Sequence, residues 1–114
     1  MAHKKFNFTI LAKNENGYIG VCECCREFNF AYKTFLLVFQ EDEMHRFFDW
    51  IISKRNSVEH QATLHHGRDR IFCSPNSNLF LTFSDEELEE ISNLYYQSNL
   101  QLQAHMLLFS NRMN

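Results

Sequence analysis

Four cysteines and six histidines are the residues of this 114-residue chain best suited to metal or redox chemistry. Cys22 and Cys25 form a C-x-x-C pair with Cys24 between them, at a predicted turn between two strands. Such a turn can direct two thiolates at one zinc ion about 2.3 Å away. The pair is half a site, because a structural zinc ion takes four ligands and the sequence holds no second C-x-x-C.

Histidines near residue 66 and one further cysteine are the candidates for the missing ligands. A shift of 44 residues, which also aligns two halves of the chain, places Cys22 on His66. Cys73 is close in sequence, and His65 is an alternative to it. One hypothesis is therefore a zinc site made of Cys22, Cys25, His66 and Cys73.

Plainer uses of these residues compete with zinc. Reduced cysteines at the end of a strand often pack as small hydrophobic side chains, and this is the simplest interpretation. A thioredoxin-like redox pair requires a helix N-terminus at its first cysteine, whereas Phe28–Tyr32 alternates as a strand does. Neighbours on a strand point to opposite faces, so His65 and His66 would share a ligand only at a bulge. His45 and His105 are expected to face solvent on helices.

Predicted strands would position the cysteines, and residues 5–13 and 28–32 show the apolar alternation typical of a half-buried strand. They are expected at residues 5–13, 18–22, 28–32, 34–39, 58–66, 71–74 and 79–83. The Asn16-Gly17 pair is a strong hairpin signal between the first two strands. Thr34–Phe39 is apolar on both faces, which predicts a central strand covered on both sides.

Two amphipathic helices are predicted, each with acidic residues at its N-terminus, where the helix dipole favours them. The first would begin at 41–43, end near Asn56 and carry an apolar stripe of Met44, Phe47, Phe48, Ile51 and Ile52. The second would begin at the Ser84–Glu87 capping box and continue to about residue 110. The alternation of Leu100–Met106 leaves open a break near Ser98 followed by a strand.

A gapless shift of 44 residues aligns residues 26–50 with residues 70–94, with five of the 25 positions identical. Each copy reads as a hairpin followed by a helix. Convergence on the same polarity pattern is the alternative to duplication. Either way, we predict an α+β fold with a mostly antiparallel sheet and two helices, built from two hairpin-then-helix units in a single domain, 1–114.

Charge and hydropathy argue against two classes of partner. The net charge is −3 and the basic residues are scattered, so we expect no nucleic acid. No apolar run approaches the roughly 18 residues of a membrane helix, so we expect no membrane. No apolar run follows the basic N-terminal residues as in a signal peptide, so we expect a cytoplasmic protein with reduced thiols.

Catalytic motifs are missing from the sequence. Three glycines, at 17, 20 and 67, cannot form a phosphate-binding loop, and no G-x-S-x-G motif occurs. No feature brings a cysteine together with a histidine base. Nothing in the sequence therefore argues for an enzyme.

Aromatic and leucine side chains in the helices suggest an interaction surface. Trp50, Tyr95 and Tyr96 are the candidates for exposed rings. Leu100, Leu107 and Leu108 would face water if the last helix extends past the core, unless a second chain covers them. We therefore predict a homodimer that uses residues after about 97, with folding back onto the sheet as the alternative.

The chain resembles a family of short bacterial proteins of unknown function. The resemblance is carried by Gly20–Phe28 and by the two strand-to-helix junctions, Val38–Glu43 and Thr82–Glu87. It covers most of the chain and implies no activity and no functional residue. Two hypotheses follow from the residues: a non-enzymatic binding or interaction domain, homodimeric through its C-terminal helix, and a zinc-stabilised domain with a Cys/His site.

Overall fold

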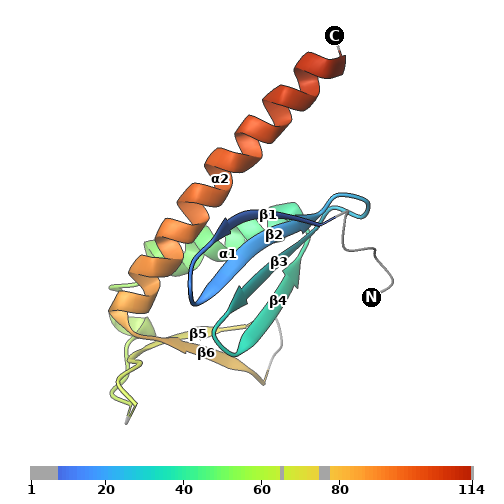
Figure 1. Cartoon of the computed structure of the whole chain (residues 1–114). Helices are drawn as coiled ribbons and strands as arrows, with labels where there is room; N and C mark the ends of the chain where they lie inside the picture. Colours follow the sequence, from blue (N-terminus) through green and yellow to red (C-terminus); the bar gives the residue numbers. More distant parts are fainter. Residues whose placement is uncertain (1–7, 65, 75–77, 114) are drawn as a thin grey trace. The chain divides into compact units, whose positions relative to one another are not determined.

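A computed structural model describes residues 8–64, 66–74 and 78–113, with side chains described up to residue 104 in the last segment (Figure 1). It shows an α+β fold with antiparallel sheets and two α-helices, as predicted. In chain order the elements are β1 (Phe8–Lys13), β2 (Gly17–Cys22), β3 (Glu27–Tyr32), β4 (Phe35–Phe39), α1 (Glu41–Ser53), the 3-10 helix η2 (Val58–His60), β5 (Arg70–Cys73), β6 (Phe80–Phe83) and α2 (Asp85–Met113).

The chain divides into two compact units. The first holds β1 to β4, the start of α1 up to His45, and α2 from Asn93 onward. The second is Arg46–Ser92 and holds the remainder of α1, η2, β5, β6 and the start of α2. The single domain expected for residues 1–114 stays a prediction.

The first unit is organised around a four-stranded antiparallel sheet in the order β1-β2-β3-β4. The β1–β2 turn is fixed by Asn14, whose side-chain oxygen accepts the amide hydrogens of Asn16 and Gly17 at 2.8 and 3.0 Å. Gly17 lies so close to β3 that a Cβ there would overlap the Ala31 carbonyl oxygen. Glycine is therefore required at this position for the turn to lie against the neighbouring strand.

One face of this sheet is the core of the first unit. Alternating side chains of β2, β3 and β4 are almost completely buried: Ile19, Val21, Phe28, Phe30, Tyr32 and Phe39. The other face is partly open, because Ile10, Leu36 and Val38 are 44%, 53% and 44% exposed. The alternation predicted for β3 thus places Phe28, Phe30 and Tyr32 on the buried face, whereas the last four residues of β2 are all buried.

The prediction of a central strand at Thr34–Phe39 was wrong. Among the described strands β4 pairs with β3 alone, which makes it an edge of the sheet. Its apolar run fills both faces, but Leu36 and Val38 lie on the open one. Apolar side chains on both faces of a strand therefore do not establish that other elements cover both faces.

The predicted strand at 58–66 was also wrong over its first residues. Val58–His60 is a 3-10 turn whose amides bond locally, from His60 to Ser57 and from Gln61 to Val58, both at 3.1 Å. Gln61 then forms an isolated bridge with Arg70. These short local bonds use the backbone groups that a sheet ladder would need.

The second unit holds a two-stranded hairpin, β5-β6, and an aromatic cluster. The His60 ring stacks on Phe72 at 4.7 Å, and the Trp50 ring meets both edge-on at 5.4 and 5.2 Å. The His60 Nδ1 also lies 3.1 Å from the Ile71 carbonyl oxygen. Phe72 is completely buried, so this cluster forms part of the core of the second unit.

Both helices begin where the sequence predicts, at Glu41 and Asp85. The capping box is confirmed, because the Ser84 amide donates to Glu87 Oε1 at 2.8 Å and the Glu87 amide donates to Ser84 Oγ at 3.1 Å. α2 then continues through Ser98 without a break, so the strand at 100–106 does not form (Figure 1). In the described part of the chain, no helix combines the length and apolarity needed to cross a membrane.

Each half of the chain thus contains a hairpin that leads into a helix. The halves also differ, because β1 and β2 extend the first hairpin into a four-stranded sheet while the second remains two-stranded. Descent of the two halves from one duplicated unit stays a prediction.

Candidate metal centre

Three of the four cysteines lie where β2 turns into β3. Cys22 is the last residue of β2 and pairs with Glu27, the first residue of β3. The loop between them is Glu23–Arg26. The Arg26 amide closes this loop with a 2.7 Å hydrogen bond to the Cys22 carbonyl oxygen. Arg26 itself has φ 61°, a left-handed conformation that reverses the chain into β3. The tight loop places Cys24 and Cys25 beside the end of β2.

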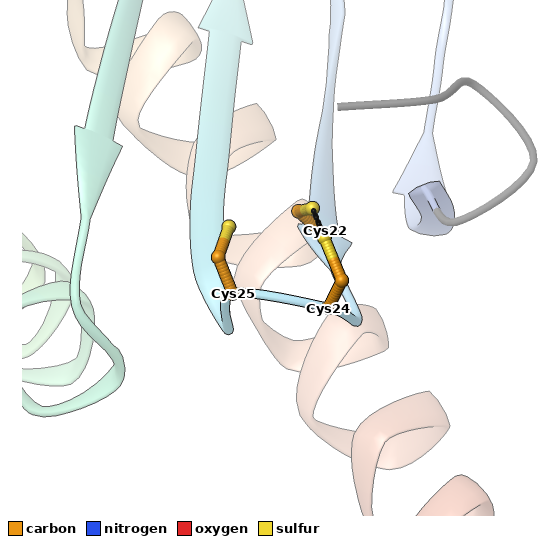
Figure 2. Close-up of side chains that lie close together, drawn as sticks. All are labelled: Cys22, Cys24 and Cys25. Atoms are coloured by element: carbon orange, nitrogen blue, oxygen red, sulfur yellow. Dashed lines mark hydrogen bonds between the residues drawn. The ribbon is translucent and has the colours of Figure 1, made fainter. Parts of the chain in front are cut away.

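The three sulfur atoms of Cys22, Cys24 and Cys25 lie within 4.8 Å of one another. Figure 2 shows them on the same side of the loop, with the Cys24 side chain turned back toward Cys22. The Cys22 and Cys24 sulfurs are 3.3 Å apart and share a hydrogen bond. Sulfur ligands about 2.3 Å from a tetrahedral zinc ion lie about 3.8 Å from each other, so small side-chain movements would place all three around one ion.

The thiols differ in their exposure to solvent. Cys22 is 3% exposed, Cys25 is half-buried and Cys24 is exposed, and all are free thiols. A metal ion could therefore enter from the Cys24 side while Cys22 is held by the sheet. The cluster combines a fixed ligand with an accessible one.

The protonation of each thiol depends on the other two. The hydrogen bond from Cys24 lowers the pKa of Cys22 below its ordinary value and favours the Cys22 thiolate. The same hydrogen bond, together with burial, raises the pKa of Cys24 to about 11. For Cys25, the Glu27 amide lowers the pKa, but burial and the Cys22 sulfur outweigh it and raise the pKa overall. Of the three thiols, Cys22 is therefore the one whose thiolate form is favoured.

The charges around the loop also favour a cation. Glu23 lies between Cys22 and Cys24 in sequence and Glu27 follows Arg26, and Glu27 Oε1 accepts a hydrogen bond from Cys25 Sγ at 3.7 Å. The positive charge of Arg26 is paired with Glu41 Oε1 at 3.2 Å. Thiols and carboxylates in this arrangement suit a metal ion better than an anionic substrate.

The structure brings together two of the four residues of the predicted zinc site. Cys22 and Cys25 are in the cluster, whereas His66 and the exposed Cys73 belong to the second unit. His66 Nδ1 accepts the amide hydrogen of Arg68 at 3.2 Å, and His65 lies outside the described residues. Among the described residues, the group of three or more close ligand atoms includes neither His66 nor Cys73.

Cys24 is the ligand candidate that sequence reasoning missed. The C-x-x-C spacing drew attention to its first and last residues and treated Cys24 as a spacer. The available signal was the length of the loop. Cys24 lies in a loop of four residues between paired strand ends, next to Cys25 and two residues from Cys22. Three thiols in such a loop predict a three-sulfur cluster.

The predicted interaction residues have different environments. Tyr96 and Leu100 are 65% and 50% exposed, as expected for a surface of α2. Trp50 is half-buried in the aromatic cluster and Tyr95 is buried, so the expectation that Tyr95 is exposed was wrong. The side chains of Leu107 and Leu108 lie outside the described residues.

His45 was also predicted wrongly, because it is not a solvated side chain without a partner. Its Nδ1 lies 2.6 Å from the Tyr95 hydroxyl, and its Nε2 lies 3.8 Å from Glu41 Oε2. This pair joins α1 to α2 within the first unit. Tyr95 is 50 residues from His45 in sequence, so spacing within one helix could not identify this partner. The side chain of His105 lies outside the described residues.

The chain belongs to the family of unknown function DUF6686, whose family model matches residues 4–112. This finding confirms the resemblance drawn from the Gly20–Phe28 motif and the two junctions. Neither the curated proteins nor the solved structures gave a match. The comparisons therefore show the family of the chain. They do not indicate what the three cysteines bind, so the chemistry of the site is inferred from its geometry alone.

Proposed function

We propose that this member of a family of unknown function is a non-enzymatic metal-binding domain in which Cys22, Cys24 and Cys25 hold one zinc ion. The observation that carries the proposal is the convergence of three free thiols whose sulfur atoms lie within 4.8 Å of one another. Thiolates are the preferred ligands of zinc in structural sites. Reduced thiols of this kind persist in the cytosol, which is where we place the protein.

The position of the thiols supports a structural role for the metal. They join the end of β2 to the start of β3, which are the two central strands of the four-stranded sheet. A metal bound there would cross-link the hairpin and disfavour the unfolded chain, which has no preformed site. Zinc at a concentration about 100-fold above its Kd would add about 2.7 kcal/mol to the free energy of unfolding.

Metal analysis of untagged, reduced protein tests the proposal. We expect about one zinc ion per chain, removable by a strong chelator with a fall in Tm. Cys24→Ser and Cys22→Ser should lose the ion. Cys73→Ser is the matched control, because Cys73 is a free exposed cysteine of the second unit, and it should keep the zinc. Zinc-free protein whose Tm does not respond to added zinc would contradict the proposal.

A second candidate function, self-association through α2, is favoured by one observation. Tyr96 and Leu100 are four residues apart, so they lie on one side of the helix, and both are largely exposed. A second copy of the chain would remove this apolar surface from water, and two-fold dimers are the commonest oligomers. Trp50, Leu107 and Leu108 complete the set of residues predicted to take part.

Sedimentation at high protein concentration tests the dimer. We expect a mass of two chains for the unaltered protein and of one chain for a Tyr96→Glu, Leu100→Glu double variant. Gln101→Glu changes an exposed position on another side of the same helix and should leave the dimer intact. A monomer at every concentration would contradict this candidate.

A further inference from the structure

We propose that the Glu27 carboxylate is the fourth ligand of this centre, which makes it a Cys3Glu site selective for a divalent cation such as Zn²⁺ over monovalent Cu⁺. The inference rests on the proposed function, since it needs the three thiolates to bind the metal. The fourth ligand would then come from the β2–β3 hairpin itself, and not from His66 or Cys73 of the second unit.

Strand register places Glu27 beside the cluster. Cys22 and Glu27 are directly paired across β2 and β3, so their side chains project from the same face of the sheet. Directly opposed residues have Cβ atoms about 4.5–5.5 Å apart. This pairing is set by the sheet. The Glu27 carboxylate lies outside the group of three mutually close sulfur atoms, so a side-chain rotation would bring it to a metal held by Cys22.

The distance between Glu27 and Cys25 fits one edge of a tetrahedral site. Glu27 Oε1 lies 3.7 Å from Cys25 Sγ, which donates a hydrogen bond to it. For Zn–S of about 2.3 Å and Zn–O of about 2.0 Å, tetrahedral geometry puts sulfur and oxygen about 3.5 Å apart. In this hydrogen bond the Cys25 thiol is the donor and the Glu27 carboxylate the acceptor, so replacing the shared proton with zinc would retain the contact through the ion.

Glu23 provides an internal comparison. It is in the same loop and lies between Cys22 and Cys24 in sequence, but its Oε2 accepts a hydrogen bond from the Thr9 hydroxyl at 2.8 Å. That contact directs the Glu23 carboxylate toward β1. The Glu27 carboxylate instead accepts a hydrogen bond from the Cys25 thiol.

The oxygen ligand gives the site its preference among metals. Soft thiolates alone bind both Cu⁺ and Zn²⁺, whereas a carboxylate adds a hard, charged ligand that benefits zinc. Removing the Glu27 charge should therefore weaken zinc binding while leaving the thiolates available to Cu⁺. A variant that unfolds would lose affinity for both metals. A fall in the ratio of zinc affinity to Cu⁺ affinity therefore reports on the carboxylate and not on the fold.

The test uses the full-length reduced chain, with Zn²⁺ and Cu⁺ as separate probes competed against chromophoric chelators. Glu27→Gln keeps the size of the side chain and removes its charge. We expect zinc affinity to fall at least about tenfold, with Cu⁺ affinity changed much less, since even outer-shell partners of a metal contribute 10–100-fold. Glu23→Gln is the matched control and should change neither affinity. His66→Ala should also leave zinc affinity unchanged.

X-ray absorption of the zinc-loaded unaltered chain gives a measurement that does not depend on any variant folding. We expect three sulfur atoms and one oxygen, without the multiple scattering of an imidazole ring. An imidazole in the shell, or unchanged zinc affinity in Glu27→Gln, would overturn the Glu27 assignment and leave the three-thiolate site standing. Failure of the unaltered chain to bind zinc at all would instead overturn the proposed function, and this inference with it.

Discussion

The two strand-to-helix junctions of this protein are Gln40–Glu43 and Ser84–Glu87. They share one capping hydrogen bond but differ in the other contacts that surround it. In both, a glutamate at the third helical position accepts the amide hydrogen of the residue before the helix, at 2.8 Å. An arginine 15 residues before the first helical residue also faces the first acidic side chain, in the pairs Arg26–Glu41 and Arg70–Asp85 at 3.2 and 3.9 Å. The shared hydrogen bond explains why both helices begin where they do.

The second junction carries more polar contacts than the first. Ser84 Oγ accepts the Glu87 amide hydrogen, and Arg68 Nε contacts both Glu87 oxygens at 3.0 and 3.1 Å. Arg55 also binds Asp85 and Glu89, each at 2.8 Å. The Arg26 and Glu41 side chains at the first junction are 46% and 41% exposed, whereas Arg55 and Glu87 at the second are 19% and 9% exposed. We therefore expect the same sequence pattern to contribute more at the second junction, because burial raises the contribution of a polar contact.

The largest expected difference between the junctions comes from their shared glutamate. Glu87→Ala should lower the free energy of unfolding by about 2–3 kcal/mol, because the side chain is nearly buried and its loss leaves the Ser84 amide and Arg68 without their acceptor. Glu43→Ala should cost about 1 kcal/mol or less, since solvent replaces the lost acceptor. Urea denaturation of both variants measures the difference, and equal losses would break the comparison.

The next largest expected difference is between Arg70 and Arg26, in how much each contributes to the free energy of unfolding. Arg70 is mostly buried, and its Nε donates to the Arg55 carbonyl oxygen at 2.6 Å, so Arg70→Ala should cost about 1.5 kcal/mol. Arg26→Ala removes an exposed ion pair and should cost less than about 0.5 kcal/mol. The same denaturation experiment separates them. A larger loss for Arg26 would show that its pairing with Glu41 matters beyond its exposure.

Substituting the residue before each helix tests whether the serine cap explains the difference between the two junctions. Ser84→Ala removes half of the capping box and should cost about 1 kcal/mol. Gln40→Ser supplies the missing half at the first junction and should raise stability by about 0.5 kcal/mol. Thermal unfolding of both variants tests whether the junctions become alike. A Gln40→Ser variant no more stable than the parent would show that the geometry there differs.

The smallest effect is a pH dependence confined to the second junction. The hydrogen bond from Arg55 lowers the pKa of Asp85 below its usual range, so the unfolded chain binds a proton here more tightly than the native one. The stabilisation is therefore complete above the unfolded pKa of about 4 and is lost as the pH falls through the native value. Asp85→Asn should flatten the fall in stability between about pH 5 and about pH 3, measured by urea denaturation. An unchanged pH profile would contradict the role of Arg55.

Local signals predicted much of this fold. The hairpin after β1, the alternation of β3 and the Ser84–Glu87 capping box depend on neighbours in sequence, and the structure confirms all three. Neither Asn16 nor Gly17 has the positive φ that favours an Asn-Gly turn, so the signal found the hairpin and not its turn geometry. The position of β4 at an edge and the 3-10 turn at Val58–His60 depend on which strands pair, which a single sequence does not encode in its spacing.

The candidate site was predicted in part for the same reason. Cys22 and Cys25 follow from local spacing, and Cys24 could have been included from the length of the loop. Glu27 is different, because its relevance comes from cross-strand pairing with Cys22 and from its contact with Cys25. Such a ligand becomes visible only when the register of the hairpin is known.

The edge position of β4 has a practical consequence for handling the protein. All five residues of this strand, Phe-Leu-Leu-Val-Phe, are apolar and uncharged, and two of them are exposed at the rim of the sheet. Segments of this composition at a sheet edge template the addition of identical strands from other molecules, which is the first step toward fibrils. Storage stability should therefore be limited by aggregation through β4, and a single lysine in place of Val38 is the most direct way to prolong it.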